Sequence, residues 1–310
     1  MSPKTLSVGT RASPLALCQA RAFAQAFARA HNIAESAVDI TPFTTKGDRL
    51  KDKSLGPLGG KGLFTAELSK ALQGGEIAAA VHSLKDVPTR LEGSVIGCVL
   101  PREQSADALI TPKGGACSLE ELAPNARIGT ASLRRKAICL AVRPELVITL
   151  LRGNVETRIG KMLEGEIDAT ILACAGINRL ALSAEKLGVA ITPLDEGVFL
   201  PAPAQGVLAV ECLAENKALR LALAGINCAT TQAEVVAERA FLAGLNGSCR
   251  TPIAARARGE GDRLILQGRI YSLDGSEQAG GSCEGHLADA EQLGTNLAQA
   301  IRTSHPHLVP

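Results

Sequence analysis

The chain carries the same sequence pattern twice, and this repeat constrains its fold more than any other feature. The stretch Val8–Leu15 reads Val-Gly-Thr-Arg-Ala-Ser-Pro-Leu, and Ile128–Arg135 reads Ile-Gly-Thr-Ala-Ser-Leu-Arg-Arg. In each copy, Gly-Thr and a Ser that can cap the next helix follow a short apolar run. A second pair, Lys70–Val81 and Lys161–Leu172, keeps the same order and approximate spacing. The repeat therefore predicts two related lobes of one α/β plan, not a short-period solenoid.

Length and composition limit the class of protein. At 310 residues the chain is too long for one typical domain, and a hydrophobic content of 46% is enough for separate cores. No stretch approaches the roughly 20 uninterrupted apolar residues of a membrane helix, so no membrane partner is expected. The N-terminus shows no signal peptide, which indicates a cytoplasmic protein. Nine cysteines without a Cys-x-x-Cys pair indicate reduced thiols, not a disulfide framework or a metal site.

The charge balance argues against nucleic acid as a partner. The formal net charge is only +2, so no global basic field attracts a polyanion. The chain has no Trp, one Tyr and six Phe, which leaves few aromatic rings on which bases could stack. The positive charge therefore acts locally.

Strand and helix signals alternate over the first two thirds of the chain and then change. The alternation predicts parallel, doubly wound sheets in two α/β lobes, with residues 207–211 returning as a strand to the first lobe. Three strand-like runs and a helix from about 288 to 302 then predict a small α+β domain with an antiparallel sheet. The expected division is lobe 1 at residues 1–103 and 200–223, lobe 2 at 104–199, and a third domain at 224–310.

The first candidate site is the segment Val81–Pro88, which follows a short, buried strand. A carboxylate at a strand end, such as Asp86, can stabilise a developing cation or exchange a proton. The alternative is that Lys85 and Asp86 are ordinary solvated loop charges. His82 could act as a base, but a single His at a strand end is more often structural.

Arginines gather where strands are predicted to end and helices to begin. Arg134 and Arg135 lie in the first turn of a helix, where a cation opposes the helix dipole. Such guanidinium groups suit the capture of carboxylates or phosphates, so we expect a multiply anionic ligand. Solvated charges and structural ion pairs are the alternative. The other members of this set are Arg11, Arg152, Arg158 and Arg179.

Two further segments carry weaker signals. Gly59–Gly62, which includes Lys61, lacks the full spacing of a phosphate-binding loop and fits a cationic flap equally well. Cys249 follows a helix end in a loop beside Arg250, which would favour the nucleophilic thiolate. An idle loop cysteine is an equally good interpretation. Six other thiols lie in or beside apolar runs and are expected to be buried: Cys18, Cys98, Cys139, Cys174, Cys212 and Cys228.

Taken in order, several motifs resemble the hydroxymethylbilane synthase family, also called porphobilinogen deaminase, from about Leu6 to Gly294. The most specific segments are Gly9–Ala16, Gly59–Phe64, Val81–Pro88, Gly129–Arg135, Leu151–Val155 and Leu200–Gly206. The resemblance implies two lobes like those of bilobal solute-binding proteins, plus a third α+β domain. It implies a monomeric transferase of tetrapyrrole and heme biosynthesis whose partner is its small-molecule substrate. Such an enzyme joins four porphobilinogen molecules head to tail, releases ammonia and yields hydroxymethylbilane.

The resemblance also assigns roles to single residues. Cys249 matches the position that holds a dipyrromethane cofactor by a thioether, and Asp86 matches the catalytic carboxylate, which would stabilise a cationic azafulvene. The implied cofactor-binding residues are Ser83, Lys85, Gly129, Thr130, Ser132, Arg134 and Arg135. The implied substrate-binding residues are Arg11, Ser13, Lys61, Arg152, Asn154, Arg158, Arg179 and Gln205.

The chain departs from the family pattern at three positions. Pro57 stands where many relatives have Lys, Ala131 where a second Ser is common, and Gly-Ser-Cys replaces Gly-Gly-Cys before Arg250. None of these changes affects Asp86 or Cys249. The competing class is a two-lobed anion receptor without chemistry, which would explain the repeat and the arginines but not the third domain with its loop thiol.

Overall fold

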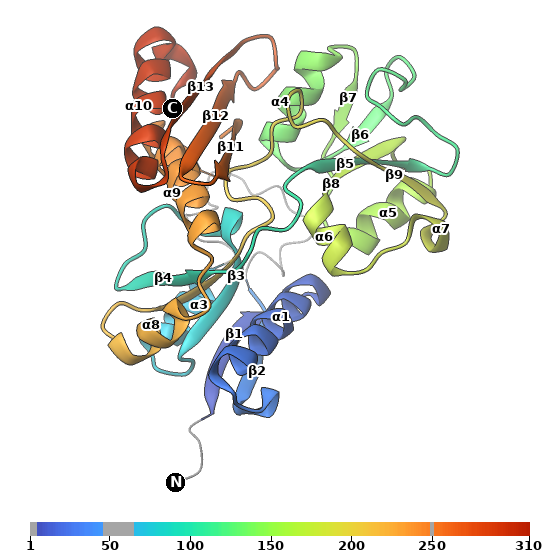
Figure 1. Cartoon of the computed structure of the whole chain (residues 1–310). Helices are drawn as coiled ribbons and strands as arrows, with labels where there is room; N and C mark the ends of the chain where they lie inside the picture. Colours follow the sequence, from blue (N-terminus) through green and yellow to red (C-terminus); the bar gives the residue numbers. More distant parts are fainter. Residues whose placement is uncertain (1–4, 46–64, 249–250) are drawn as a thin grey trace. The chain divides into compact units, whose positions relative to one another are not determined.

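The computed structural model describes residues 5–45, 65–248 and 251–310. The chain forms two compact units (Figure 1). Unit 1 comprises Met1–Glu103 and Val207–Gln232, and unit 2 comprises Gln104–Gly206 and Ala233–Pro310. Unit 1 therefore contains the sheet of the first expected lobe without residues 200–206, and unit 2 contains the second lobe together with the C-terminal antiparallel sheet. The expected boundaries at residues 200 and 224 stay a prediction.

Unit 1 is built on a five-stranded sheet with the order β2-β1-β3-β10-β4. The strand β1 runs parallel to β2 and β3, whereas β10 runs antiparallel to both β3 and β4. The prediction that residues 207–211 return to this lobe is thus confirmed. The strand bounds are β1 Leu6–Arg11, β2 Val38–Phe43, β3 Ala79–Ser83, β4 Ser94–Val99 and β10 Leu208–Leu213.

Helices cover this sheet and fill its core. Ser13 caps the first helix by accepting a hydrogen bond from the Ala16 amide at 3.3 Å, with Pro14 at the first helical position. Phe23 and Phe27 of this helix pack with Val8 and Val81 into a buried cluster. The helical bounds are α1 Pro14–His31, α3 Ala66–Gln73 and α8 Lys217–Ala224, with short 3-10 turns at η1 Glu35–Ala37 and η2 Leu84–Asp86.

The second lobe, inside unit 2, repeats this plan. Its five-stranded sheet has the order β7-β6-β8-β5-β9, in which β6 is parallel to β7 and β8, and β5 is antiparallel to β8 and β9. The strands are β5 Asp107–Pro112, β6 Arg127–Gly129, β7 Val147–Thr149, β8 Ala169–Ala173 and β9 Val189–Pro193. The helices are α4 Leu133–Val142, α5 Val155–Leu163, α6 Cys174–Arg179 and α7 Ala184–Leu187.

The two sheets match residue for residue at their centres. Gly9 of β1 lies opposite Ala80 of β3, and Gly129 of β6 lies opposite Thr170 of β8. A Cβ atom on Gly9 would lie 2.4 Å from Ile77 Cδ1, and one on Gly129 would lie 2.5 Å from Ile167 Cδ1. The repeated Gly is therefore needed because a repeated Ile packs on it.

The C-terminal part of unit 2 is an antiparallel sheet with helices. The strands β11 Ile253–Glu260, β12 Arg263–Tyr271 and β13 Gln278–His286 pair in sequence order. Phe241 lies against β12 so closely that a Cβ atom on Gly268 would meet its ring at 2.5 Å. The predicted α+β part is confirmed. Its remaining elements are α9 Ala229–Gly244, η3 Leu287–Asp289, α10 Ala290–Ser304 and η4 Pro306–Leu308.

The segment before β10 is held by this C-terminal part. The Ala255 amide of β11 donates to Pro201 O at 3.0 Å, and Glu238 Oε2 of α9 accepts from the Ala204 amide at 2.6 Å. Ala204 has a φ of 62°, in the left-handed region that costs an ordinary residue energy. The Glu238 carboxylate helps to stabilise that conformation, and the segment lies in unit 2 for this reason.

The α/β fold class is confirmed, but the expectation of wholly parallel sheets is wrong. Both sheets are mixed because β5 and β10 enter from connections that carry no crossover helix, so they can lie antiparallel to their neighbours. The sequence patterns also missed β4, β5 and β9. Among the residues that the structure describes, no helix combines the length and apolar character that crossing a membrane requires.

Candidate active site

The first group of candidate residues lies where β1 and β3 end. Because these strands are parallel, their last residues, Arg11 and Ser83, lie at one edge of the sheet. The chain continues from Ser83 into the single turn η2, which ends at Asp86. The Leu84 amide donates to Val207 O at 3.0 Å and anchors this turn to the start of β10. Asp86, the last residue of this turn, is half-buried.

The end of β3 is also attached to α1. Gln19, which is 3% exposed, donates from Nε2 to the Ser83 hydroxyl at 2.8 Å. Lys85, half-buried, lies in η2 between Ser83 and Asp86. The sequence patterns did not identify Gln19, because an amide on the helix face that covers a sheet carries no charge to mark it.

A buried carboxylate lies next to this strand end. Glu211 of β10 is fully buried and accepts hydrogen bonds from His82 Nε2 at 2.9 Å and from Ser94 Oγ at 2.5 Å. Burial raises the pKa of Glu211, but hydrogen bonds from His82, Ser94 and Ser69 and the His82 charge outweigh it. The net pKa lies below its ordinary value of 4.5. His82 is therefore structurally engaged, which favours the structural interpretation over that of a free base.

The second group of candidate residues surrounds Asp107, the first residue of β5. Arg134 Nη2 donates to Asp107 Oδ2 at 2.6 Å, and Arg135 Nη2 donates to Oδ1 at 2.6 Å. Gln205 Nε2 also donates to Oδ1, at 3.0 Å. Asp107 is fully buried, and it lies opposite Ala173, the last residue of β8. The carboxylate is thus at the strand ends of this lobe.

These contacts change the interpretation of Arg134 and Arg135. Both side chains are buried, at 4% and 6% exposure, so they are not solvated charges. Burial lowers the pKa of Arg134 and the neighbouring Asp107 opposes that shift, but an arginine stays charged at neutral pH. Arg134 also donates to Leu200 O at 2.8 Å, and Arg135 to Ile171 O at 2.7 Å. The two arginines and Asp107 together carry one net positive charge.

Several of the predicted polar residues accept hydrogen bonds from nearby backbone amides. Ser132 caps α4 by accepting from the Arg135 amide at 3.4 Å, and Thr130 Oγ1 accepts from the Ser132 amide at 3.1 Å. Asn154 caps α5 by accepting from the Thr157 amide at 2.8 Å. These caps fix the first turns of both helices at the strand ends.

The remaining arginines of this lobe are half-buried. Arg158 Nε donates to Gly153 O at 2.9 Å, and Arg179 Nη2 donates to Gly206 O at 2.7 Å. Arg152 Nε is buried and has no hydrogen-bond partner among the described residues. Such an atom fits a site in which an anionic ligand supplies the missing acceptor. Lys61 and Cys249 lie outside the described residues.

Family models match nearly the whole chain. The model for "Porphobilinogen deaminase, dipyromethane cofactor binding domain" matches residues 6–221, and that for "Porphobilinogen deaminase, C-terminal domain" matches residues 232–303. The porphobilinogen deaminases of Nitrobacter hamburgensis and Nitrobacter winogradskyi are 44% and 45% identical to this chain over 297 residues, which cover 96% of this chain and 92% of each relative. The chain belongs to the porphobilinogen deaminase family.

As a porphobilinogen deaminase the chain is a transferase of tetrapyrrole synthesis with a dipyrromethane cofactor, and the receptor alternative is set aside. Solved structures overlap with it more loosely. The periplasmic VFT2 domain of BvgS from Bordetella pertussis has a TM-score of 0.44 at 11% identity, covering 72% of this chain and 87% of that one. An ancestral arginine-binding protein bound to glutamine has a TM-score of 0.40 at 16% identity, covering 73% and 92%.

The resemblance implies that a thiol holds the cofactor, so the state of each described thiol bears on that expectation. Burial raises the pKa of the Cys98 and Cys139 thiols to about 12 and that of Cys174 to about 11, so these thiols are poor nucleophiles. Cys212 is also buried, whereas Cys18 and Cys228 are only half-buried. Cys117, which the sequence patterns passed over, is exposed. Among the described residues, Cys117 is therefore an exposed thiol that a test of the attachment position must include.

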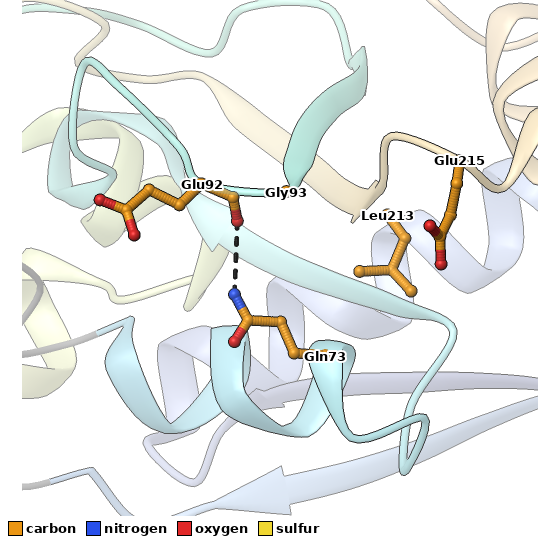
Figure 2. Close-up of a pocket in the computed structure, with 5 residues that line it drawn as sticks. All are labelled: Gln73, Glu92, Gly93, Leu213 and Glu215. Carbon is orange, nitrogen blue, oxygen red and sulfur yellow. Dashed lines mark hydrogen bonds between the residues drawn. The ribbon is translucent and has the colours of Figure 1, made fainter.

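A surface hollow of about 360 Å³ lies elsewhere in unit 1 of this porphobilinogen deaminase. Figure 2 shows its lining: Gln73 at the end of α3, Glu92 and Gly93 before β4, Leu213 at the end of β10 and Glu215 after it. Leu213 pairs with Ser94, whereas Leu208, at the other end of β10, pairs with Ser83. The hollow therefore lies at the opposite end of the strands from Asp86. Within the described ranges, no group of three or more His, Cys, Asp or Glu side chains could hold a metal ion.

Proposed function

We propose that the strand ends of the two lobes share the work of the porphobilinogen deaminase reaction. The enzyme condenses four porphobilinogen molecules head to tail, with release of ammonia, to give hydroxymethylbilane. In this proposal lobe 1 supplies the carboxylate that acts on the reacting pyrrole, and lobe 2 supplies cations for the acetate and propionate groups. We further propose that the enzyme works as a cytoplasmic monomer.

The carboxylate of Asp86 is the group that we assign to the chemical step. The hydrogen bonds from Leu84 to Val207 and from Val87 to Leu84, both 3.0 Å, fix the turn that carries it. A fixed, half-buried carboxylate can stabilise positive charge that develops on a pyrrole as ammonia leaves, and it can accept or return a proton. This placement at the end of β3 is the observation that carries the proposal. The Ser83 and Lys85 side chains next to it would hold cofactor carboxylates.

The arginines are proposed to hold carboxylates in two ways. Arg11, Arg152, Arg158 and Arg179 are half-buried and can extend towards a ligand, and Arg152 Nε supports this role because it is a buried donor without an acceptor. Arg134 and Arg135 are fixed by Asp107 and contribute their net charge and their remaining N–H groups. Ser13, Thr130, Gly129, Ser132, Asn154 and Gln205 would then shape the strand ends around the ligand.

The dipyrromethane, when bound, supplies the pyrrole to which the first substrate is joined. We propose that Cys249 holds it through a thioether and that Lys61 adds a positive charge beside the site. The cationic groups at both sets of strand ends fit a cofactor that carries carboxylates. The buried Arg152 Nε is the donor that most directly calls for such an acceptor.

The replacement of Asp86 by Asn tests the chemical role. It preserves size and removes charge, so turnover should fall by about 10² or more while the protein stays folded. The mass of the denatured protein reports whether the cofactor is still attached. Asp39→Asn is the matched control, because Asp39 is an exposed carboxylate of β2 in the same unit. Near-normal turnover of the folded, cofactor-loaded Asp86→Asn enzyme contradicts the assignment.

The attachment thiol is tested by mass spectrometry of the denatured enzyme. The protein should be heavier than its sequence by one dipyrromethane, and the adduct should map to the peptide that contains Cys249. Cys249→Ser should lack the adduct and be nearly inactive. Cys117→Ser removes an exposed thiol and should keep both adduct and activity. An adduct on any other cysteine overturns the assignment.

A further inference from the structure

The buried cluster around Glu211 is not used by the reaction as assigned above. We propose that Glu211 and His82 form a positioning pair that holds the end of β3, and with it Asp86, in the geometry that the reaction needs. The inference rests on the proposed role of Asp86. Glu211 bonds to His82, the residue before Ser83, so it acts on the end of β3 through His82.

Glu211 connects three elements of unit 1. Its carboxylate accepts hydrogen bonds from His82 of β3, from Ser94 of β4 and from Ser69 of α3. A fully buried carboxylate costs several kcal/mol unless such donors surround it. Satisfied in this way, it can fix the relative positions of the elements that donate to it.

The backbone of β10 is irregular at this residue. The pairing of β10 with β4 shifts register between Val210 and Glu211, as in a β-bulge. Bulges re-aim side chains and are frequent next to active sites. Glu211 lies opposite Ala80 of β3, which places it on the same face as Ala80 and His82. The carboxylate therefore reaches His82 diagonally across the two strands.

The second lobe shows that the fold does not need this pair. Ile110 of β5 lies opposite Thr170, as Glu211 lies opposite Ala80. Leu172 follows Thr170 by two residues, as His82 follows Ala80. Lobe 2 thus builds the same two strands with an Ile and a Leu. A costly polar pair that the shared topology does not require calls for a role beyond folding.

The location of the pair connects it to Asp86. His82 immediately precedes Ser83, whose hydroxyl is bonded to Gln19 of α1. Neighbouring residues of a strand face opposite sides of the sheet, so β3 is fixed on one side by Glu211 and on the other by Gln19. Asp86 follows within one short turn. A small displacement of β3 at His82 therefore moves the catalytic carboxylate, and a misplacement of about 1 Å can cost about 10²-fold in rate.

Two variants of the full-length enzyme test the pair. Glu211→Gln removes the charge with little change of shape, and we expect kcat to fall about tenfold or more with KM changed less than about twofold. The double variant His82→Leu/Glu211→Ile copies the residues of lobe 2. Because apolar residues replace a buried pair, it should unfold at or above the temperature of the unaltered enzyme, yet keep the low kcat. Cofactor loading is checked by mass in each case.

The controls separate positioning from stability. Thr111→Val removes a buried hydrogen bond of lobe 2, from Thr111 Oγ1 to Ala116 O at 2.9 Å, and should lower the unfolding temperature without lowering kcat. A normal kcat in Glu211→Gln overturns the proposal. So does a double variant that recovers both stability and kcat, or one that does not fold. Asp86→Asn is assayed in parallel: if it keeps normal turnover the role of Asp86 fails, whereas a slow Asp86→Asn with a fast Glu211→Gln removes only the positioning pair.

Discussion

The two lobes share one topology. Each has a buried carboxylate on the corresponding strand, β10 or β5, but at a different position along that strand. In lobe 1, Glu211 lies inside β10 opposite Ala80, and its partners are His82 and Ser94. In lobe 2, Asp107 begins β5 opposite Ala173, and its partners are two arginines and Gln205. The position in lobe 1 that corresponds to Asp107 is Leu208, opposite Ser83.

This difference separates the residues that the topology of a lobe requires from the residues that its candidate site requires. The Gly-Thr strand end, the Ser cap and the packed Ile occur in both lobes, and both lobes have the same strand order. The buried carboxylates occupy positions that are apolar in the other lobe, so they are not required by the topology. Lobe 1 leaves a carboxylate, Asp86, at its strand ends, whereas lobe 2 gathers arginines there and neutralises part of their charge with Asp107.

The largest effect is expected from Asp107→Leu, which gives lobe 2 the residue that lobe 1 has at this position. The change leaves Arg134 and Arg135 buried without their carboxylate, and breaking such a buried pair costs about 3–5 kcal/mol of unfolding free energy. Chemical denaturation measures it. Asp168→Leu, which breaks the exposed pair with Arg127, should change stability little. If Asp107→Leu is no less stable than Asp168→Leu, the two lobes do not differ as described.

Arg134→Leu and Arg152→Leu should differ from each other in their effect on stability. Arg134→Leu leaves the buried Leu200 carbonyl without its donor and should cost about 1–3 kcal/mol of stability. Arg152→Leu should keep the unfolding temperature and raise KM for porphobilinogen, because Arg152 Nε has no partner among the described residues. Thermal unfolding measures the stability of both variants, and steady-state kinetics measures KM. Equal stability of the two variants would show that the Asp107 group contributes no rigidity.

A smaller effect concerns the acid limb of stability. The pKa of Glu211 is lowered in the folded chain, so its contribution to stability is present above the ordinary value of 4.5 and is lost as the pH falls through the folded pKa. The difference in unfolding free energy between the unaltered enzyme and Glu211→Gln should therefore shrink as the pH falls below 4.5. If this difference in unfolding free energy stays constant over the range, the charge of Glu211 does not contribute to stability.

The smallest effect should be equal in both lobes. Ser13→Ala and Ser132→Ala each remove a helix cap, at 3.3 Å and 3.4 Å, and each should cost about 1 kcal/mol or less. Thermal unfolding of the two variants measures the loss of stability in each lobe. A clear loss in only one lobe would mean that the repeated Ser has diverged in function, as the carboxylates have.

The features of this enzyme that could be predicted from the sequence depend on local patterns. The repeated segments with Gly-Thr and a capping Ser, together with the apolar run at β3, indicated two lobes and placed Asp86 at a strand end. The strands β4 and β5 were missed because no α-helix separates them from β3, so strand and helix signals do not alternate there, and β9 follows only the four-residue helix α7. A charged residue inside an apolar run, as in Leu208–Leu213, was the one available sign of Glu211, because a carboxylate buried in a strand needs donors.

The sequence by itself determined the family, the α/β lobes and the side chains available for chemistry, because apolar spacing, caps and ordered motifs are properties of neighbours along the chain. Only the tertiary structure decided which of those side chains are engaged. Asp107 is 27 residues from Arg134 and 98 from Gln205, and Glu211 is 129 from His82. Contacts over such separations depend on strand order and register, and a register change of one residue would turn each carboxylate to the other face of its sheet.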